Sequence, residues 1–161
     1  HAYHSLYGVR STGLRFFTVY GPLGRPDMAV WAWTANMTRN KPIKVYQPDD
    51  GILMRDFTYI DDIIDGVVAA MDYAADWAIF NLGRGEPQSV NELVVRLEKE
   101  LGVGAKVISR PLPKGDVRVT YADTSYAGRV LGYRPNISIA EGVKRFVDWY
   151  KSYNKMIAET T

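Results

Sequence analysis

Two arginines at the ends of apolar stretches are the residues in this sequence best suited to bind an anion. Arg25 lies on a loop rich in Gly and Pro that follows residues 14–20, and Arg55 lies in a second apolar stretch beside Asp56. A guanidinium group can donate two parallel hydrogen bonds to a phosphate or a carboxylate. Both positions therefore favour an anionic ligand. For Arg55 the alternative is an ion pair with Asp56 or Asp61 on a solvated face.

Two further segments could complete such a site. Residues 43–46, with the sequence IKVY, could border a flat heterocycle through their backbone groups, or could form an ordinary edge strand. Asp116, in the sequence KGDV, could accept hydrogen bonds from ribose hydroxyls, although an aspartate in such a setting is also typical of a turn. The sequence alone leaves both alternatives open.

Several other chemistries are not supported by any motif. The sequence GRGEP follows a predicted strand, but it lacks the glycine spacing and the following helix of a dinucleotide-binding loop. His1 and His4 are expected to be solvent-exposed and do not have the spacing of metal ligands, and there is no G-x-S-x-G elbow of a serine hydrolase. We therefore predict no metal site.

Composition and charge argue against two further classes, nucleic-acid-binding proteins and membrane proteins. The 161 residues are 47% hydrophobic and 24% charged, with a formal net charge of only +2 and no cysteine. The scattered basic residues do not favour nucleic-acid binding. No apolar run approaches the roughly 20 residues of a membrane span, and no signal peptide is visible. A cytoplasmic protein without membrane contact is the expectation, and the absence of thiols agrees with it.

The order of the elements favours an α/β fold. His1 to Gly13 reads as the last turns of a helix that runs into a loop. The predicted strands cover residues 14–20, 43–46, 52–57, 78–83 and 106–109, with 43–46 and 52–57 on either side of a PDDG turn. Gly21-Pro22 ends the first strand, because proline cannot donate a hydrogen bond to a sheet. The strand at 14–20 lacks clean alternation, so we expect it to be buried on both faces between parallel neighbours.

Four helices are predicted from apolar spacing and capping residues. The first covers residues 28–40, and the second covers 62–72 with Asp61 or Asp62 as its cap. Ser89 and Glu92 form one capping box and Ser138 and Glu141 another. The apolar faces of the last three are expected to be Ile63, Ile64, Val67, Val68 and Met71; Val90, Leu93, Val94, Leu97 and Leu101; and Ile139, Val143, Phe146, Val147 and Tyr150. The aromatic residues at 146–153 are expected to pack in the core.

Six segments, in order, resemble one known family. They are LRFFTVYGP, KPIKVY, RDFTYIDD, FNLGRGEPQSVNEL, KGDVRVTYAD and LGYRPNISIAEGVKRFVDWY. They are similar to the C-terminal half of extended short-chain dehydrogenase/reductase enzymes that act on nucleotide sugars, and FFTVYGPLGRPDMA resembles the UDP-glucuronate 4-epimerases among them. The resemblance covers essentially the whole chain.

The resemblance implies an α/β fold in which residues 1–161 form the C-terminal, mainly substrate-binding part of a Rossmann-type enzyme. The N-terminal dinucleotide-binding half is lacking, and strands near 14–20 and 78–83 are expected to complete the sheet of that half. Relatives commonly dimerise, so a homodimer is expected for the full-length enzyme.

The resemblance also assigns roles to individual residues. Thr18 and Arg25 would attend the carboxylate of the sugar. The remaining substrate-binding residues would be Lys44, Val45 and Tyr46 beside the uracil, Arg55 at the diphosphate and Asp116 at the ribose; the residues near NAD would be Phe16, Phe17, Tyr20 and Pro22. One departure concerns Pro113, where many relatives carry a phosphate-binding Arg that Lys114 or Arg110 could replace here.

The implied reaction is the NAD-dependent 4-epimerisation of UDP-glucuronate to UDP-galacturonate through a 4-keto intermediate. The catalytic Tyr and Lys of the family would lie upstream of this chain, so we assign no catalytic residue here and expect the isolated chain to be inactive. The alternatives are another UDP-sugar epimerase, decarboxylase or dehydratase of the same superfamily, or a sugar-nucleotide binding module without catalysis.

Overall fold

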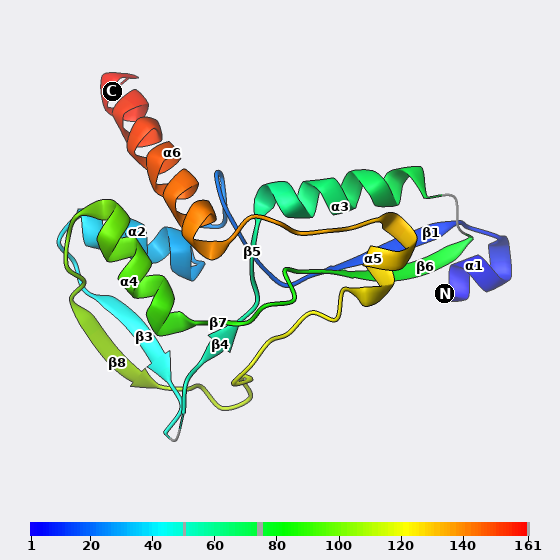
Figure 1. The fold of residues 1–161 in the computed structure, drawn as a ribbon, viewed down its shortest axis with the longest axis horizontal. Helices are drawn as coiled ribbons and strands as arrows, with labels where there is room; N and C mark the ends of the chain where they lie inside the picture. The colour runs from blue at the N-terminus through cyan, green and yellow to red at the C-terminus, as the bar shows by residue number, and fades with distance from the viewer. Residues whose placement is uncertain (50, 74–75, 161) are drawn as a thin grey trace.

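A computed structural model describes residues 1–49, 51–73 and 76–160 and shows an elongated α/β fold (Figure 1). The helices are α1 (Ala2–Tyr7), α2 (Ala29–Thr38), α3 (Ile60–Asp72), α4 (Val90–Leu101), α5 (Ser125–Leu131) and α6 (Ile139–Thr160). The strands are β1 (Ser11–Phe16), β2 (Thr18–Tyr20), β3 (Ile43–Gln47), β4 (Met54–Arg55), β5 (Phe57–Tyr59), β6 (Trp77–Leu82), β7 (Gln88–Ser89) and β8 (Val107–Pro111).

Four pairs of strands connect distant parts of the described chain. The pairs β1–β6, β2–β5 and β3–β8 are parallel, whereas β4 and β7 are antiparallel. In Figure 1, β1, β6, α3 and α5 occupy one end of the molecule, and α2, α4, α6, β3 and β8 occupy the other. The short pairs β2–β5 and β4–β7 lie between these ends.

Each end of the molecule has its own hydrophobic cluster. The larger cluster joins α2, α4 and α6 to β3 and β5, and includes the fully buried Phe57, Leu93 and Phe146. The smaller cluster lies between α3, α5 and β6 around Phe80 and Leu82. The connection between the two clusters therefore depends on β2, β5 and the loops beside them.

The predictions for α4 and α6 are confirmed. The predicted apolar faces are buried, apart from Leu101, which is half-buried. Ser89 Oγ accepts a hydrogen bond from Asn91 N, and Ser138 Oγ accepts one from Glu141 N. Gly102 ends α4 with a φ of 71°, a left-handed conformation in which glycine is the least strained residue. The predicted core role of the aromatic residues at 146–153 also agrees with ring contacts from Trp31 to Phe146, Trp149 and Tyr150.

The prediction of one strand at 14–20 is wrong, because the chain changes partner at Phe17. Phe17 N donates to Leu82 O on β6, and the next amide, Thr18 N, donates to Asp56 O. The result is two strands, β1 and β2, in two different sheets. Burial on both faces is also absent from β1 among the described residues, since all of its positions are exposed or half-buried.

The strand predicted at 43–46 is confirmed as β3, but the prediction of one partner strand at 52–57 across the PDDG turn is wrong. β3 pairs in parallel with β8, and residues 52–57 divide into β4 and β5, which pair with β7 and β2. Asp50 of that turn lies outside the described residues. Pairing of β3 with a strand more than 60 residues away cannot be read from the local turn signal, which explains the error.

The prediction for the helix at 62–72 is partly wrong. α3 begins at Ile60 with Tyr59 as its N-cap, so neither Asp61 nor Asp62 caps it. Ile63 is buried, but Ile64, Val68 and Met71 are 49%, 52% and 79% exposed. Small residues, Gly66 and Ala70, replace them on the packed face, where a Cβ on Gly66 would lie 2.8 Å from Leu82.

Candidate functional site

Five of the predicted substrate-binding residues line one cavity of about 420 Å³, which we call the β3 cavity. They come from four separate segments, because two of them lie on β3, and are Thr18, Lys44, Tyr46, Arg55 and Asp116. The other lining residues are Asp27, Met28, Ala29, Ala32, Trp33, Leu53, Phe57 and Val90. The cavity therefore combines an apolar floor with cations and hydrogen-bonding groups, a combination typical of small-molecule sites.

Arg55 is the most firmly held cation of the β3 cavity. Its side chain is 15% exposed, and it donates to Met54 O over 2.9 Å and to Asp116 Oδ1 over 2.9 Å. The alternative given for Arg55, an ion pair with Asp56 or Asp61 on a solvated face, does not hold as stated, because its partner is Asp116. The two residues predicted to bind diphosphate and ribose thus contact each other in this structure.

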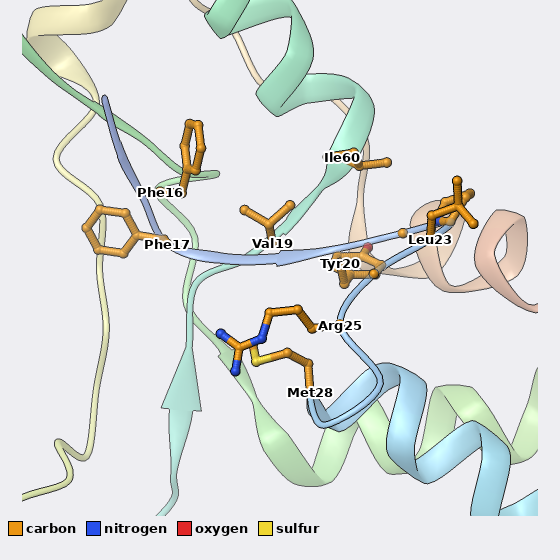
Figure 2. A pocket seen from close by; sticks show the side chains of 11 residues that line it. Phe16, Phe17, Val19, Tyr20, Leu23, Arg25, Met28 and Ile60 are labelled. Carbon is orange, nitrogen blue, oxygen red and sulfur yellow. The ribbon is translucent and has the colours of Figure 1, made fainter. Parts of the chain in front are cut away.

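A second cavity of about 400 Å³, the β2 cavity, lies beside β2 and the loop after it (Figure 2). It is lined by Phe16, Phe17, Val19, Tyr20, Gly21, Pro22, Leu23, Gly24, Arg25, Met28 and Ile60. All four residues that the resemblance places near NAD are in this set. Phe16 is 52% exposed, so its ring offers an apolar face to a ligand.

Arg25 lies at the boundary between the two cavities. Its side chain lines the β2 cavity, and in Figure 2 it extends on the same side of β2 as Met28. Arg25 Nε donates to Asp27 Oδ1 over 3.1 Å, while Asp27 and Met28 line the β3 cavity. The hydrogen bond from Arg25 lowers the pKa of the Asp27 carboxyl below its usual range, so at neutral pH both groups are charged.

The position of Tyr20 limits its role in the β2 cavity. Tyr20 is 5% exposed, and its ring makes edge contacts with Phe57 and Tyr59. Its hydroxyl lies against Gly142 of α6, where a Cβ would overlap the oxygen. Burial raises the pKa of this hydroxyl, which stays neutral and packs as part of the core.

Three other residues from the predictions do not line the β3 cavity. The side chain of Val45 is buried in the larger hydrophobic cluster, so a contact with a ligand would have to come from its backbone. Arg110 stands opposite Tyr46 in the register of β3 and β8, and Lys114 lies on the exposed loop that follows. Replacement of the expected Arg at Pro113 by one of these two remains a prediction.

The sequence indicates Asp56 only as a possible partner of Arg55, whereas in the structure it joins several segments next to the β3 cavity. It is fully buried, and its carboxylate accepts hydrogen bonds from Arg84 N, Gly85 N and Ala122 N at 2.8 to 2.9 Å. Its own backbone oxygen accepts from Thr18 N. The carboxylate thereby ties the loop after β6 and the segment before α5 to Asp56, while its backbone oxygen holds the start of β2. The sequence feature that indicates this role is an acidic residue between two apolar strand segments.

Asp62 has a similar role at the start of α3. Its two carboxylate oxygens accept from Asn136 N and Ile137 N, which ties the segment before α6 to α3. The sequence prediction treated this residue as a possible helix cap, whereas it is a buried anchor for a distant loop.

Sequence comparison assigns the family. Residues 1–83 match the sequence profile of the NAD dependent epimerase/dehydratase family, slightly more than half of the chain. The chain belongs to this family.

Within this family, the chain is similar to several named nucleotide-sugar epimerases. UDP-glucuronate 4-epimerase 5 of Arabidopsis thaliana is 45% identical over an aligned region of 168 positions, gaps included, and the match covers 95% of this chain and 38% of the relative. A crystal structure of UDP-glucuronic acid 4-epimerase from Bacillus cereus with UDP-glucuronic acid and NAD is 36% identical, with a TM-score of 0.87 over 95% of this chain and 49% of that one. UDP-glucose 4-epimerase from Thermotoga maritima with UDP-glucose is 31% identical, with a TM-score of 0.85 over 95% of this chain and 50% of that one.

The chain therefore spans about two-fifths to one-half of the length of these relatives. The α/β fold expected from the sequence is confirmed by this likeness to extended short-chain dehydrogenase/reductase structures. Within the part of the chain that the structure describes, there is no helix long and apolar enough to cross a membrane.

Proposed function

We propose that this chain forms the sugar-nucleotide site of an NAD-dependent UDP-glucuronate 4-epimerase. The observation that supports it best is the meeting of Thr18, Lys44, Tyr46, Arg55 and Asp116 in the β3 cavity. The sequence points to each of these residues independently of the fold, and they come from segments as far as 98 positions apart (18 to 116). The likeness to UDP-glucuronate 4-epimerases supports the choice of sugar.

Charge and burial suggest how the cavity would hold the ligand. Arg55, mostly shielded from solvent, would donate to the diphosphate, because a cation in a partly desolvated site binds an anion more strongly than an exposed one does. Asp116 would accept from the ribose hydroxyls, and Lys44 and Tyr46 would border the uracil. Thr18 and Arg25 would contact the sugar carboxylate from the boundary with the β2 cavity.

The residues present fit one end of NAD. Phe16, Phe17 and Pro22 provide an apolar surface at the β2 cavity that suits a flat nicotinamide ring. When bound, NAD supplies a reversible hydride acceptor. The chain's own part is to position the sugar beside that surface and to exclude water from it.

Product analysis tests this proposal. The intact natural protein, supplied with NAD and UDP-glucuronate, is expected to form UDP-galacturonate, identified by NMR of the sugar 4-proton. Loss of carbon dioxide or of water from the sugar would instead indicate a decarboxylase or a dehydratase. Binding without any product would favour the module without catalysis. The isolated 161-residue chain is expected to be inactive under the same conditions.

UDP-glucose is the second candidate substrate, because the chain is also similar to a UDP-glucose 4-epimerase. The two candidates differ at Arg25, since a neutral hexose gives this guanidinium no carboxylate to bind. Comparing kcat/KM for UDP-glucuronate and UDP-glucose on the same preparation decides between them. A preference for UDP-glucose would contradict the assignment of Thr18 and Arg25 to a carboxylate.

A further inference from the structure

Asp27 places a carboxylate where the proposed substrate would place another one. It lies two residues after Arg25, lines the β3 cavity beside Thr18, and accepts hydrogen bonds from both Nε and an Nη of Arg25. This two-point contact is the one that a guanidinium makes with any carboxylate. Asp27 therefore occupies the Nε face of Arg25, one of the two faces at which a guanidinium can bind a sugar carboxylate by two hydrogen bonds, and its charge neutralises the cation.

The ion pair between Arg25 and Asp27 can break readily. The side chains of Arg25 and Asp27 are 73% and 64% exposed, so water can replace each partner without leaving a buried charge. The sequence around them, GRPDM, precedes α2, whose N-cap Met28 lines both cavities. Release of Arg25 from Asp27 would thus leave the guanidinium at the boundary of the β3 cavity.

Resting on the function proposed above, we infer that Asp27 is a specificity-determining residue that competes with the sugar carboxylate for Arg25. A ligand with a carboxylate can take over the guanidinium. A neutral sugar cannot, and it meets an Arg25 that is already paired with Asp27. The residue thereby lowers the affinity for acidic sugars to a moderate level without affecting the binding of the shared UDP group.

The test compares UDP-glucuronate with UDP-glucose in the intact protein carrying Asp27→Asn. Asn has the same shape as Asp but lacks the negative charge that holds Arg25. Kd for UDP-glucuronate, measured by calorimetry, is expected to fall about threefold, the size of effect typical of exposed ion pairs, whereas Kd for UDP-glucose stays unchanged. Asp27→Ala is expected to act in the same direction, which separates loss of the charge from any new contact of the Asn amide.

Asp148→Asn is the matched control for net charge. Asp148 is an exposed carboxylate paired with Lys144, and it does not line either cavity. Its removal is expected to leave the ratio of the two Kd values unchanged. In an Arg25→Ala background, Asp27→Asn is likewise expected to lose its selective effect, because the competitor has no guanidinium to hold.

Three outcomes would overturn the inference, and they differ in meaning. Weaker binding of UDP-glucuronate by Asp27→Asn would show that Asp27 positions Arg25 for the substrate. An equal change for both ligands would show a general effect of charge. A wild-type protein that binds UDP-glucose as tightly as UDP-glucuronate would refute the proposed function, and the role of Asp27 would be refuted with it.

Discussion

The molecule contains two arginine–aspartate pairs at its proposed ligand site, and they differ in almost every physical respect. Arg55 and Asp116 are 61 residues apart in sequence, and the arginine is 15% exposed with further hydrogen bonds to backbone oxygens. Arg25 and Asp27 are two residues apart and largely exposed. The same chemical pair thus forms a fixed cation in one place and an exchangeable one in the other.

The difference suggests that the two arginines bind different parts of the ligand. A fixed guanidinium suits the part of the ligand that every UDP-sugar shares, because its position is set before binding. An exchangeable guanidinium suits the variable part, the sugar, where the protein must discriminate. Four measurements test this contrast between the two pairs.

Replacing Asp56 is expected to have the largest effect, because this residue fixes the strand that carries Arg55. Asp56→Ala leaves one buried and two partly buried backbone N–H groups without an acceptor, and it should reduce the free energy of unfolding by about 3 kcal/mol or more. Urea unfolding of the intact protein measures it. Asp116→Ala is the control, since Asp116 is partly exposed and should cost about 1 kcal/mol or less. Equal losses for the two variants would remove the basis for calling the Arg55 region fixed.

Arg55→Ala should come next, and it should weaken all UDP ligands together. Loss of a partly buried charged donor is expected to raise Kd for UDP, UDP-glucose and UDP-glucuronate by about tenfold to a hundredfold. Calorimetry with the three ligands measures it. Arg55→Lys keeps the charge without the two-point geometry, and it should restore only part of the affinity. If UDP-glucuronate alone were affected, Arg55 would belong to the sugar rather than to the diphosphate.

Arg25→Ala should have a smaller and selective effect. We expect kcat/KM for UDP-glucuronate to fall about tenfold while the affinity for UDP-glucose changes little, because only the acidic sugar offers Arg25 a second charge. An effect below that of Arg55→Ala is expected from the greater exposure of Arg25. Steady-state kinetics and UDP-glucose binding measure the two quantities. Equal losses for both sugars would give Arg25 a general structural role and would abolish the contrast between the two pairs.

The two pairs also differ in how well they could be predicted from the sequence. Arg25 and Arg55 were both recognised as anion-binding candidates from their residue type and position. The contact between Arg55 and Asp116 cannot be read from neighbouring sequence, because the fold brings together residues that are 61 positions apart. Asp27 is adjacent enough to be suspected, yet an Asp two residues from an Arg is too common a pattern to indicate a competing carboxylate.

The fold shows the same difference between features that neighbouring residues determine and features that depend on residues far away in the sequence. α4 and α6 follow from apolar periodicity and Ser caps, which lie within a few residues of each other. The division of 14–20 into β1 and β2 depends on Leu82 and Asp56, which accept from successive amides but lie in other parts of the chain. The exposed face of α3 escaped prediction because helical spacing identifies an apolar stripe but not what packs on it.

Acid titration of Asp27 is expected to give the smallest effect, and it tests the exchangeable pair directly. The hydrogen bond from Arg25 holds the pKa of the Asp27 carboxyl below its usual range. The pair therefore stabilises the folded protein above pH 4, about the pKa of an unfolded aspartate, and this contribution is lost as the pH falls through the lower folded value. Because both side chains are exposed, the change in unfolding free energy should be small, so carboxyl-carbon NMR of the individual residue is the better measurement.

In Arg25→Ala the pKa of Asp27 should rise toward the usual range of an aspartate, because the hydrogen bond that lowers it is lost. That of Asp148, which Lys144 holds below its usual range, should not move and serves as the internal reference. Addition of UDP-glucuronate to the wild-type protein should raise the pKa of Asp27 in the same way, because the sugar carboxylate takes Arg25 from it, whereas UDP-glucose should leave it low. A pKa of Asp27 that responds to neither the substitution nor the ligand would mean that Arg25 is not exchanged, and both pairs would then be fixed.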